Sequence, residues 1–215
     1  MNIVITGTSR GIGRAIALKF MDCGHTVTGI DICPAAIENS LYIHHTRDIL
    51  RDELPEVADV EILINNAGVQ DSGNDIDVNL KGTMRVTEKY GFQEKIKSIL
   101  FIASASASTG AEFPEYAASK GGMVSYMKNT ALRAAKYGAT SNSLSPGGVL
   151  TDLNAHIIKD PKLWKQVMDE TLLPKWASAE EIAEWAYFVT VINKSMTAQD
   201  ILIDNGEAAK SNFVW

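Results

Sequence analysis

The sequence predicts an α/β domain with one doubly wound parallel sheet, and three observations lead to this prediction. Short apolar segments rich in β-branched residues alternate along the chain with longer segments whose apolar residues recur at helical spacing. Such alternation is typical of a parallel sheet with helices on both faces. The length of 215 residues and the apolar fraction of 46% fit one globular core without repeats or low-complexity linkers. We therefore expect a single domain over residues 1–215.

The chain opens with a strand, a glycine-rich turn and a helix. Residues 2–5 form a β-branched apolar run, and Gly7, Gly11 and Gly13 precede apolar residues at helical spacing from Ala15 onward. This order places the N–H groups and the positive dipole end of a helix where a phosphate can bind. Glycines would let a pyrophosphate approach the backbone. A tight turn without a ligand is the alternative, because the spacing differs from Gly-x-Gly-x-x-Gly.

Further strands and helices alternate to the end of the chain. We expect strands at residues 25–31, 41–45, 60–64 and 98–103, another before Ser145, and a last one at 200–204. We expect helices at about 80–90, at about 114–136 with a proline in first position, and from the Ser178/Glu181 capping box to about 191. Ligands of such sheets bind at the carboxyl ends of the strands. The residues that follow strand ends should therefore share one edge: Asp31, Asp48, Asn65, Ser104 and Pro146.

Composition argues against several classes of function. A net charge of −6 without a basic run disfavours nucleic acid as a partner. No apolar run approaches the roughly 18 residues that cross a membrane, and a strand from residue 2 leaves no room for a signal peptide. Cys23 and Cys33 lack metal-ligand or redox spacing, which indicates reduced thiols in a cytoplasmic protein. His44 and His45 would point to opposite faces of a strand, so we expect no metal site and assign them no role.

Motifs along the whole chain resemble those of the short-chain dehydrogenase/reductase family. They are, in order, Thr6-Gly7-x-x-x-Gly11-Ile12-Gly13, Asn65-Asn66-Ala67-Gly68, Asn79 in V-N-L-K-G, Ser104, Tyr116-x-x-x-Lys120 and Pro146-Gly147-x-x-x-Thr151. Each motif is weak alone, but their joint occurrence in this order is specific. The resemblance implies a Rossmann-type fold and an NAD(P)-dependent enzyme that interconverts a secondary alcohol and a ketone.

The spacing of Tyr116 and Lys120 supports this chemistry independently. Four residues apart on a helix, their side chains share one face. A phenol of pKa about 10 is a poor base at neutral pH, but a neighbouring ammonium and an oxidised nicotinamide ring would lower its pKa. Tyr116 could then exchange a proton with a carbonyl or alcohol oxygen as a hydride moves, while Ser104 holds that oxygen. Alternatively, the tyrosine only packs and the lysine is a solvated surface charge.

The resemblance also implies roles for individual residues. The catalytic set would be Tyr116, Lys120, Ser104 and Asn79, with Asn79 anchoring a water beside the lysine in a proton relay. Cofactor-binding residues would be Gly7, Ser9, Arg10, Gly11, Ile12, Gly13, Asp31, Asp48, Asn66, Ala67, Gly68, Lys120, Pro146, Gly147 and Thr151. Residues 152–176 would form a substrate lid, whose apolar side chains either close over an apolar substrate or pack the lid onto the body.

The chain departs from the family pattern at four places. The family serine usually lies thirteen residues before the tyrosine, where Ala103 stands, so Ser104 fits only with a shorter loop and Ser106 is the reserve. The interval from Asn65 to Asn79 is roughly half the usual one, and the crossover at residues 48–60 is also short. We expect trimmed helices there, with a more open cleft or a smaller subunit contact. Asp-Asn-Gly at 204–206 replaces Asp-Gly-Gly, and we expect it to alter only a turn.

Two signals point to different cofactors. Arg10 occupies the position of an arginine that, in some family members, pairs with the 2′-phosphate of NADP. Asp31 ends a strand at the position where a carboxylate would accept hydrogen bonds from the adenosine ribose of NAD. A carboxylate about 4 Å from a doubly charged phosphate costs several kcal/mol at an effective dielectric near 20. An exposed arginine returns about 1 kcal/mol or less. We therefore expect NAD(H), with NADP less favoured.

Assembly and substrate are less defined by the sequence. Family members are mostly homodimers or homotetramers built through two long central helices, here at about 80–90 and 114–136, so we expect a homo-oligomer. We also expect the apolar tail at 212–215 to dock on the body of its own chain or on a neighbouring subunit. The substrate could be a 3-oxoacyl thioester, a hydroxysteroid, a polyol or another secondary alcohol. The alternative function is a catalytically inactive dinucleotide-binding regulator or scaffold, which the intact Tyr116, Lys120 and Asn79 disfavour.

Overall fold

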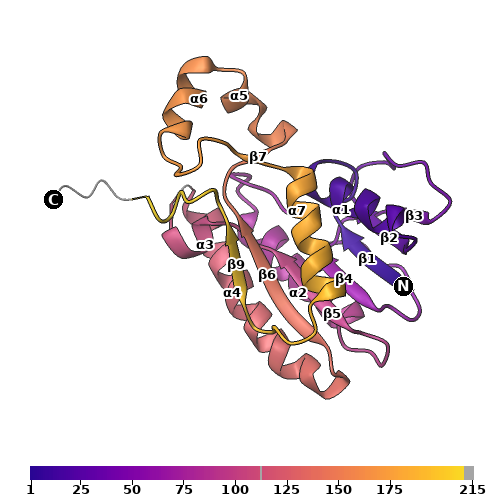
Figure 1. Cartoon of the computed structure of the whole chain (residues 1–215). Coiled ribbons are helices and arrows are strands. Elements are labelled where there is room, and N and C mark those ends of the chain that lie inside the picture. The colour runs from indigo at the N-terminus through magenta and orange to yellow at the C-terminus, as the bar shows by residue number, and fades with distance from the viewer. Residues whose placement is uncertain (112, 211–215) are drawn as a thin grey trace.

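The computed structural model describes residues 1–111 and 113–210 and contains a seven-stranded parallel sheet (Figure 1). The strand order is β3-β2-β1-β4-β5-β6-β9. The strands are β1 (Asn2–Thr6), β2 (Thr26–Asp31), β3 (Tyr42–Thr46), β4 (Ile62–Asn65), β5 (Ser98–Ile102), β6 (Thr140–Pro146) and β9 (Asp200–Ile203). Every neighbouring pair is parallel. The chain runs outward from β1 to one edge and then from β4 to the other, so the predicted doubly wound α/β fold is confirmed.

Helices cover both faces of the sheet. The helices α1 (Gly11–Asp22) and α7 (Ala179–Tyr187) lie side by side on one face, and α2 (Thr83–Tyr90) and α4 (Pro114–Ala134) lie on the other (Figure 1). Side chains alternate along β1, so Ile3 and Ile5 join the core under α1 and α7 while Val4 joins the core under α2 and α4. Each fully buried aliphatic side chain contributes about 1.5–3 kcal/mol, so these two cores hold the strand ends in place.

The predicted helices exist, but one of them begins and another ends in π-helical form. The helix expected at about 80–90 begins earlier as the π-helix η1 (Ile76–Gly82) and continues into α2. The helix expected to reach about 191 is α-helical to Tyr187 and continues as the π-helix η4 (Phe188–Ile192). The long helix α4 ends two residues earlier than expected and is followed by a 3-10 turn, η2 (Ala135–Tyr137). Apolar periodicity does not distinguish a single π-turn from an α-helix, which explains the difference.

Three connections between β2 and η1 carry no helix. Residues 32–41 join β2 to β3, residues 47–61 join β3 to β4, and residues 66–74 join β4 to the helical segment that leads into η1; all three segments are described and none is helical. The trimming expected for the second and third segments is therefore confirmed.

The segment from 151 to 176 stands apart from the body of the domain beyond β7 (Val149–Leu150) (Figure 1). It contains η3 (Asp152–Asn154), α5 (Ala155–Ile158) and α6 (Pro161–Met168), and returns through β8 (Ala177–Ser178), which pairs with β7. No residue of these three helices is buried. Trp176, the last residue of the segment, is buried, and Trp164 contacts it edge-to-face with ring centroids 5.2 Å apart. Most of the apolar surface of this segment is therefore not used in packing it onto the body.

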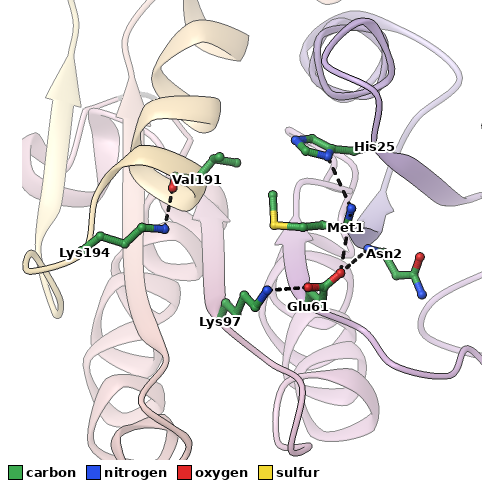
Figure 2. Close-up of polar contacts among 7 residues, drawn as sticks. All are labelled: Met1, Asn2, His25, Glu61, Lys97, Val191 and Lys194. Carbon is green, nitrogen blue, oxygen red and sulfur yellow. Dashed lines mark hydrogen bonds and ion pairs between the residues drawn. The ribbon is translucent and has the colours of Figure 1, made fainter.

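The amino ends of the strands meet at Glu61, which immediately precedes β4 (Figure 2). Its Oε2 accepts a hydrogen bond from the backbone N–H of Asn2 at 2.8 Å, and its Oε1 pairs with Nζ of Lys97 at 2.5 Å. The α-ammonium of Met1 lies 3.9 Å from Oε2 and 3.4 Å from Nδ1 of His25. Burial opposes ionisation, but the bonds from Lys97 and Asn2 outweigh it and lower the pKa of Glu61. One carboxylate thus links the starts of three adjacent strands.

Two expectations from composition concern the thiols and membranes. Cys23 is an exposed free thiol and Cys33 a half-buried one. Among residues 1–111 and 113–210, no helix has the length and apolarity to cross a bilayer. The tail expected to dock at 212–215 lies outside the described residues.

Candidate active site

The glycine-rich turn between β1 and α1 has an open helix N-terminus. No side chain caps α1, whose N-cap residue Arg10 is extended and exposed. The N–H groups of the first helical turn can therefore serve an anion. Gly7 and Gly11 adopt φ values of +75° and +55°, a region that favours glycine.

Two glycines of this turn are also required by the packing of the chain itself. A Cβ on Gly13 would lie 2.0 Å from the carbonyl oxygen of Gly7, and a Cβ on Gly7 would lie 2.7 Å from Nδ2 of Asn66. That Nδ2 donates to the carbonyls of Thr6 and Gly7 at 2.9 and 3.0 Å. Room for a pyrophosphate is thus not the sole reason for these glycines. Asn66, predicted to bind cofactor, also fixes the turn from the end of β4.

Asp31 ends β2 beside this turn, with its carboxylate held in one orientation. Oδ2 accepts from the backbone N–H of Ser9 and Oδ1 from that of Cys33, each at 2.8 Å. The Ser9 hydroxyl is turned into the loop and donates to the carbonyl of Pro34 at 2.9 Å. An ionised carboxylate accepts about four hydrogen bonds. Asp31 can therefore receive ribose hydroxyls in addition to its two backbone donors.

A hydrogen-bonded chain beside Asp31 was missed by the sequence analysis, which assigned no role to His44. The hydroxyl of Tyr42 lies 2.7 Å from Oγ1 of Thr8 and 2.9 Å from Nδ1 of His44, whose Nε2 lies 3.0 Å from the carbonyl of Cys33. A carbonyl only accepts, so in the neutral imidazole Nε2 donates, Nδ1 accepts from Tyr42, and Tyr42 accepts from Thr8. Residue 29 is glycine because a Cβ there would lie 2.2 Å from the Tyr42 hydroxyl. These hydrogen bonds connect β3 and the loop after β2 to the glycine-rich turn.

The other residues predicted to bind cofactor are placed along the same edge. Thr151 lies over the turn, since a Cβ on Gly11 would be 3.6 Å from its Cγ2. Asp48 opens the turn after β3, where its Oδ1 accepts from the N–H of Leu50 at 2.8 Å. The remainder lie in the same turn, after β4 and at the end of β6: Ile12, Ala67, Gly68, Pro146 and Gly147.

Tyr116 and Lys120 lie near the start of α4 on one helix face. Nζ of Lys120 is 5.6 Å from the centroid of the Tyr116 ring. Lys120 is only 4% exposed, and its Nζ donates to the carbonyl of Ile102, at the end of β5, at 2.9 Å. Burial lowers the pKa of Lys120 to about 8, while the charge of Asp75 acts in the opposite direction. The lysine is therefore not the solvated surface charge considered as an alternative.

Asn79 is fully buried in η1 and connects the segments on either side of the lysine. Its Oδ1 accepts from the N–H of Val69 at 2.8 Å, and its Nδ2 donates to the carbonyl of Val69 and to Oγ of Ser119 at 2.9 and 3.0 Å. A Cβ on Gly68 would lie 3.0 Å from Oδ1 of Asn79 and 3.6 Å from Nζ of Lys120. Asn79 and Lys120 thus flank the same glycine, and π-turns occur frequently at such functional positions.

Ser104 and Ser106 form a pair after β5. The hydroxyl and the N–H of Ser106 both donate to Oγ of Ser104, at 2.8 and 3.2 Å. Ser104 is 8% exposed. Because its Oγ accepts both bonds from Ser106, the hydroxyl proton of Ser104 is left for another acceptor.

The site combines three features: a turn that can bind an anion, the carboxylate of Asp31, which can accept hydrogen bonds from hydroxyl groups, and the phenol of Tyr116 beside the buried ammonium of Lys120. In the part of the chain that the structure describes, no group of three or more His, Cys, Asp or Glu residues could hold a metal ion. The donors present fit a dinucleotide with a pyrophosphate and ribose hydroxyls. One residue near the lysine, Asp75, was not singled out by the sequence analysis.

Known proteins resemble the chain over nearly its whole length. Residues 48–207 match the family model described as Enoyl-(Acyl carrier protein) reductase. A 3-oxoacyl-acyl-carrier-protein reductase of Staphylococcus epidermidis is 25% identical, over 94% of this chain and 97% of that protein. The L-rhamnose 1-dehydrogenase (NADP(+)) of Thermoplasma acidophilum is 27% identical, over 95% of each chain. The ligand-free aldohexose dehydrogenase of Thermoplasma acidophilum has the same fold, with a TM-score of 0.85, 24% identity, and coverage of 100% of this chain and 96% of that one.

Proposed function

We infer the chemistry of this site from the premise that the chain belongs to the short-chain dehydrogenase/reductase family, which the match over residues 48–207 establishes. The chain is an oxidoreductase of the alcohol/ketone type that acts on CH–OH groups with NAD(P). The finer proposal is an NAD(H)-dependent enzyme with Tyr116 as general acid and base. The observation that carries it is the buried ammonium of Lys120, 5.6 Å from the centroid of the Tyr116 ring, at the edge that also holds the glycine-rich turn.

In the direction of reduction, the phenol of Tyr116 donates a proton to the carbonyl oxygen of the substrate. Ser104 donates a hydrogen bond to the same oxygen, and the ammonium of Lys120 stabilises the phenolate that remains. The nicotinamide ring, when bound, supplies or accepts the hydride. In oxidation, the phenolate takes the alcohol proton. A positioned acid of this kind contributes roughly 10²- to 10⁴-fold in rate.

The preference for NAD(H) is supported by the fixed orientation of Asp31. Its carboxylate, held by the N–H groups of Ser9 and Cys33, would face a 2′-phosphate. Like charges about 4 Å apart repel by about 4 kcal/mol per unit charge at an effective dielectric near 20. Arg10 is exposed, so its attraction is screened by solvent. NADP(+) is the cofactor in the name of the Thermoplasma acidophilum relative, and that name applies to that protein.

An apolar substrate, such as a 3-oxoacyl thioester or a hydroxysteroid, is supported by the proposed lid at 152–176. Its side chains Leu153, Ile158 and Leu163 are exposed, and so is Phe113, immediately before the helix that carries Tyr116. Exposed apolar side chains around a site indicate a surface that a ligand covers. A lid of this kind closes over its substrate and excludes water.

The proposed homodimer or homotetramer would form through α2 and α4. Leu132, in the last turn of α4, is 78% exposed. Burying it against a second copy removes apolar surface from water. Light scattering at micromolar concentration tests this, and a monomeric mass would contradict it.

The test of the proposed function is oxidation of NADH and of NADPH against a panel of ketones. The panel contains 3-oxoacyl thioesters, ketosteroids and keto sugars, and turnover should appear with at least one of them. We expect a higher kcat/KM with NADH than with NADPH. A higher value with NADPH would overturn the cofactor proposal and leave the reaction class untouched.

A further inference from the structure

Asp75 is a buried carboxylate that the mechanism above does not use. It directly precedes η1 and is 1% exposed, a position that aspartate almost never takes without partners. Its Oδ1 accepts from the N–H of Asp71 at 2.9 Å, and its Oδ2 accepts from the N–H and the hydroxyl of Ser72 at 2.9 and 3.0 Å. These bonds fold the short connection between β4 and η1 back onto the start of η1.

The helix η1, which follows Asp75, packs against the turn of α4 that carries Lys120. Asn79, four residues after Asp75, bonds to Ser119. Leu80 approaches Gly122 so closely that a Cβ there would lie 2.9 Å from its Cδ2. Lys120 stands between these two contacts on α4, and its Nζ lies beside Gly68 together with Oδ1 of Asn79. Asp75, directly before η1, and Lys120, on α4, are therefore both buried where these two helices pack together.

Lys120 has little other support for a buried charge. Among the described residues, its Nζ makes one hydrogen bond, to the carbonyl of Ile102, although an ammonium has three N–H groups. A buried ammonium is strongly unfavourable without a counter-charge. Asp75 is the acid whose charge raises the pKa of Lys120 against the lowering by burial.

The remaining charged groups near the lysine do not take this role. Asp77 lies two residues after Asp75 but pairs with Lys81 at 2.6 Å, where the side chains of Lys81 and Asp77 are 65% and 44% exposed. Glu115, on α4, is exposed. Tyr116 faces Nζ as well, with its ring centroid 5.6 Å away.

We propose that Asp75 is a positioning residue of the proton-transfer site: it closes the 70–75 loop and keeps the ammonium of Lys120 charged beside Tyr116. Its importance for turnover rests on the proposed function. Its action on the lysine does not, because that action is present before any substrate binds.

The experiment follows the titration of Lys120 Nζ by NMR in the full chain labelled with ¹³C,¹⁵N-lysine, with Lys120→Met assigning the signal. Asp75→Asn should lower the midpoint by about one pH unit or more, the size expected for loss of a nearby opposite charge. The matched control Asp77→Asn removes an exposed carboxylate of the same helix and should leave the midpoint unchanged. Ser72→Ala removes two loop hydrogen bonds, one to Asp75 and one from Asn74, but no charge, so it should lower Tm slightly at a constant midpoint.

An unchanged midpoint in Asp75→Asn with a lowered Tm would overturn the proposal, because Asp75 would then only close the loop. If Asp75→Asn does not fold, Asp75→Glu gives the answer, since it keeps the charge while disturbing the loop bonds. A midpoint within about half a pH unit of wild type supports the proposal, and a fall of about one unit overturns it.

The pH profile separates this proposal from the proposed function. With a substrate that turns over, the alkaline limit of kcat/KM should move to lower pH in Asp75→Asn and stay in place in Asp77→Asn. A shifted lysine midpoint together with full turnover by Tyr116→Phe would reject the mechanism and retain the electrostatic role of Asp75. An unchanged lysine midpoint in Asp75→Asn together with lost turnover in Tyr116→Phe would reject the role of Asp75 and retain the mechanism.

Discussion

The amino ends and the carboxyl ends of the strands form two edges of the sheet, and each edge holds a lysine in different surroundings. At the amino edge, Lys97 is 57% exposed and pairs with Glu61 (Figure 2). At the carboxyl edge, Lys120 is 4% exposed, donates to a backbone carbonyl, and has its pKa lowered to about 8 by burial. Water screens the first charge, so its pairing matters little. The protonation state of Lys120 depends on its neighbours, because its pKa lies close to physiological pH. Proton-transfer sites use groups with pKa values in this range.

The sharpest test of this contrast removes one hydroxyl from the carboxyl edge. Tyr116→Phe keeps the ring volume, so the chain should fold and bind cofactor normally, whereas turnover should fall at least about a hundredfold. The matched control is Tyr126→Phe on the same helix, whose hydroxyl donates to Glu88 at 2.9 Å. Steady-state kinetics, cofactor fluorescence and thermal unfolding measure the three properties. Near-normal turnover by Tyr116→Phe would show that the general acid is another group.

The second prediction compares the pH dependence of stability at the two edges. Because the pKa of Lys120 is about 8 in the folded chain and 10.5 in the unfolded chain, the unfolded chain binds more protons between these values. Stability should therefore rise with pH across this window, by an amount approaching about 3 kcal/mol.

Lys120→Met should remove this rise and Lys97→Met should keep it, as measured by denaturant unfolding at pH 7 to 10. An equal pH slope in wild type and Lys120→Met would mean that the lysine is not desolvated in the folded chain.

The difference between the edges could be predicted from the sequence only in part. Periodicity located every strand of the main sheet, and a spacing of four residues put Tyr116 and Lys120 on one helix face. Asp75 was missed because it stands in the polar run Ser-Gly-Asn-Asp at 72–75, which is typical of a solvated loop. Its burial depends on loop bonds to Asp71 and Ser72 and on contacts between η1 and α4 that no local pattern encodes.

Strand register was a second limit on prediction. His44 reaches Tyr42 and the loop after β2 because β3 pairs with β2 so that His44 is opposite Gly29. Alternation predicted that His44 and His45 point to opposite faces, but it did not predict the neighbour of His44 on the next strand. Likewise, Asn66 was recognised through a motif, whereas its hydrogen bonds to Thr6 and Gly7 arise from the pairing of β1 with β4.

A smaller effect is expected at the ribose end of the carboxyl edge. Asp31→Ala removes the charge that would repel a 2′-phosphate and leaves the N–H groups of Ser9 and Cys33 without their acceptor. Both changes favour NADPH, so the ratio of kcat/KM for NADPH over NADH should rise at least about tenfold, equivalent to about 1.4 kcal/mol. Asp48→Ala, at the neighbouring strand end, tests whether any acid at this edge acts the same way. An unchanged ratio in Asp31→Ala would place the ribose elsewhere.

The smallest effect belongs to the amino edge. Glu61→Gln removes the charge that pairs with Lys97 but keeps an oxygen that can accept from the N–H of Asn2. We expect a loss of less than about 1 kcal/mol, which salt reduces further, and no change in kcat/KM. Because the pKa of Glu61 is lowered in the folded chain, the charge stabilises the fold above the usual glutamate value of about 4.3 and loses its effect as the pH falls through the folded value. The two proteins should therefore converge in stability in acid, as denaturant unfolding at pH 3 and pH 7 would show. A loss of turnover in Glu61→Gln would instead mean that the two edges are coupled through the strands that join them.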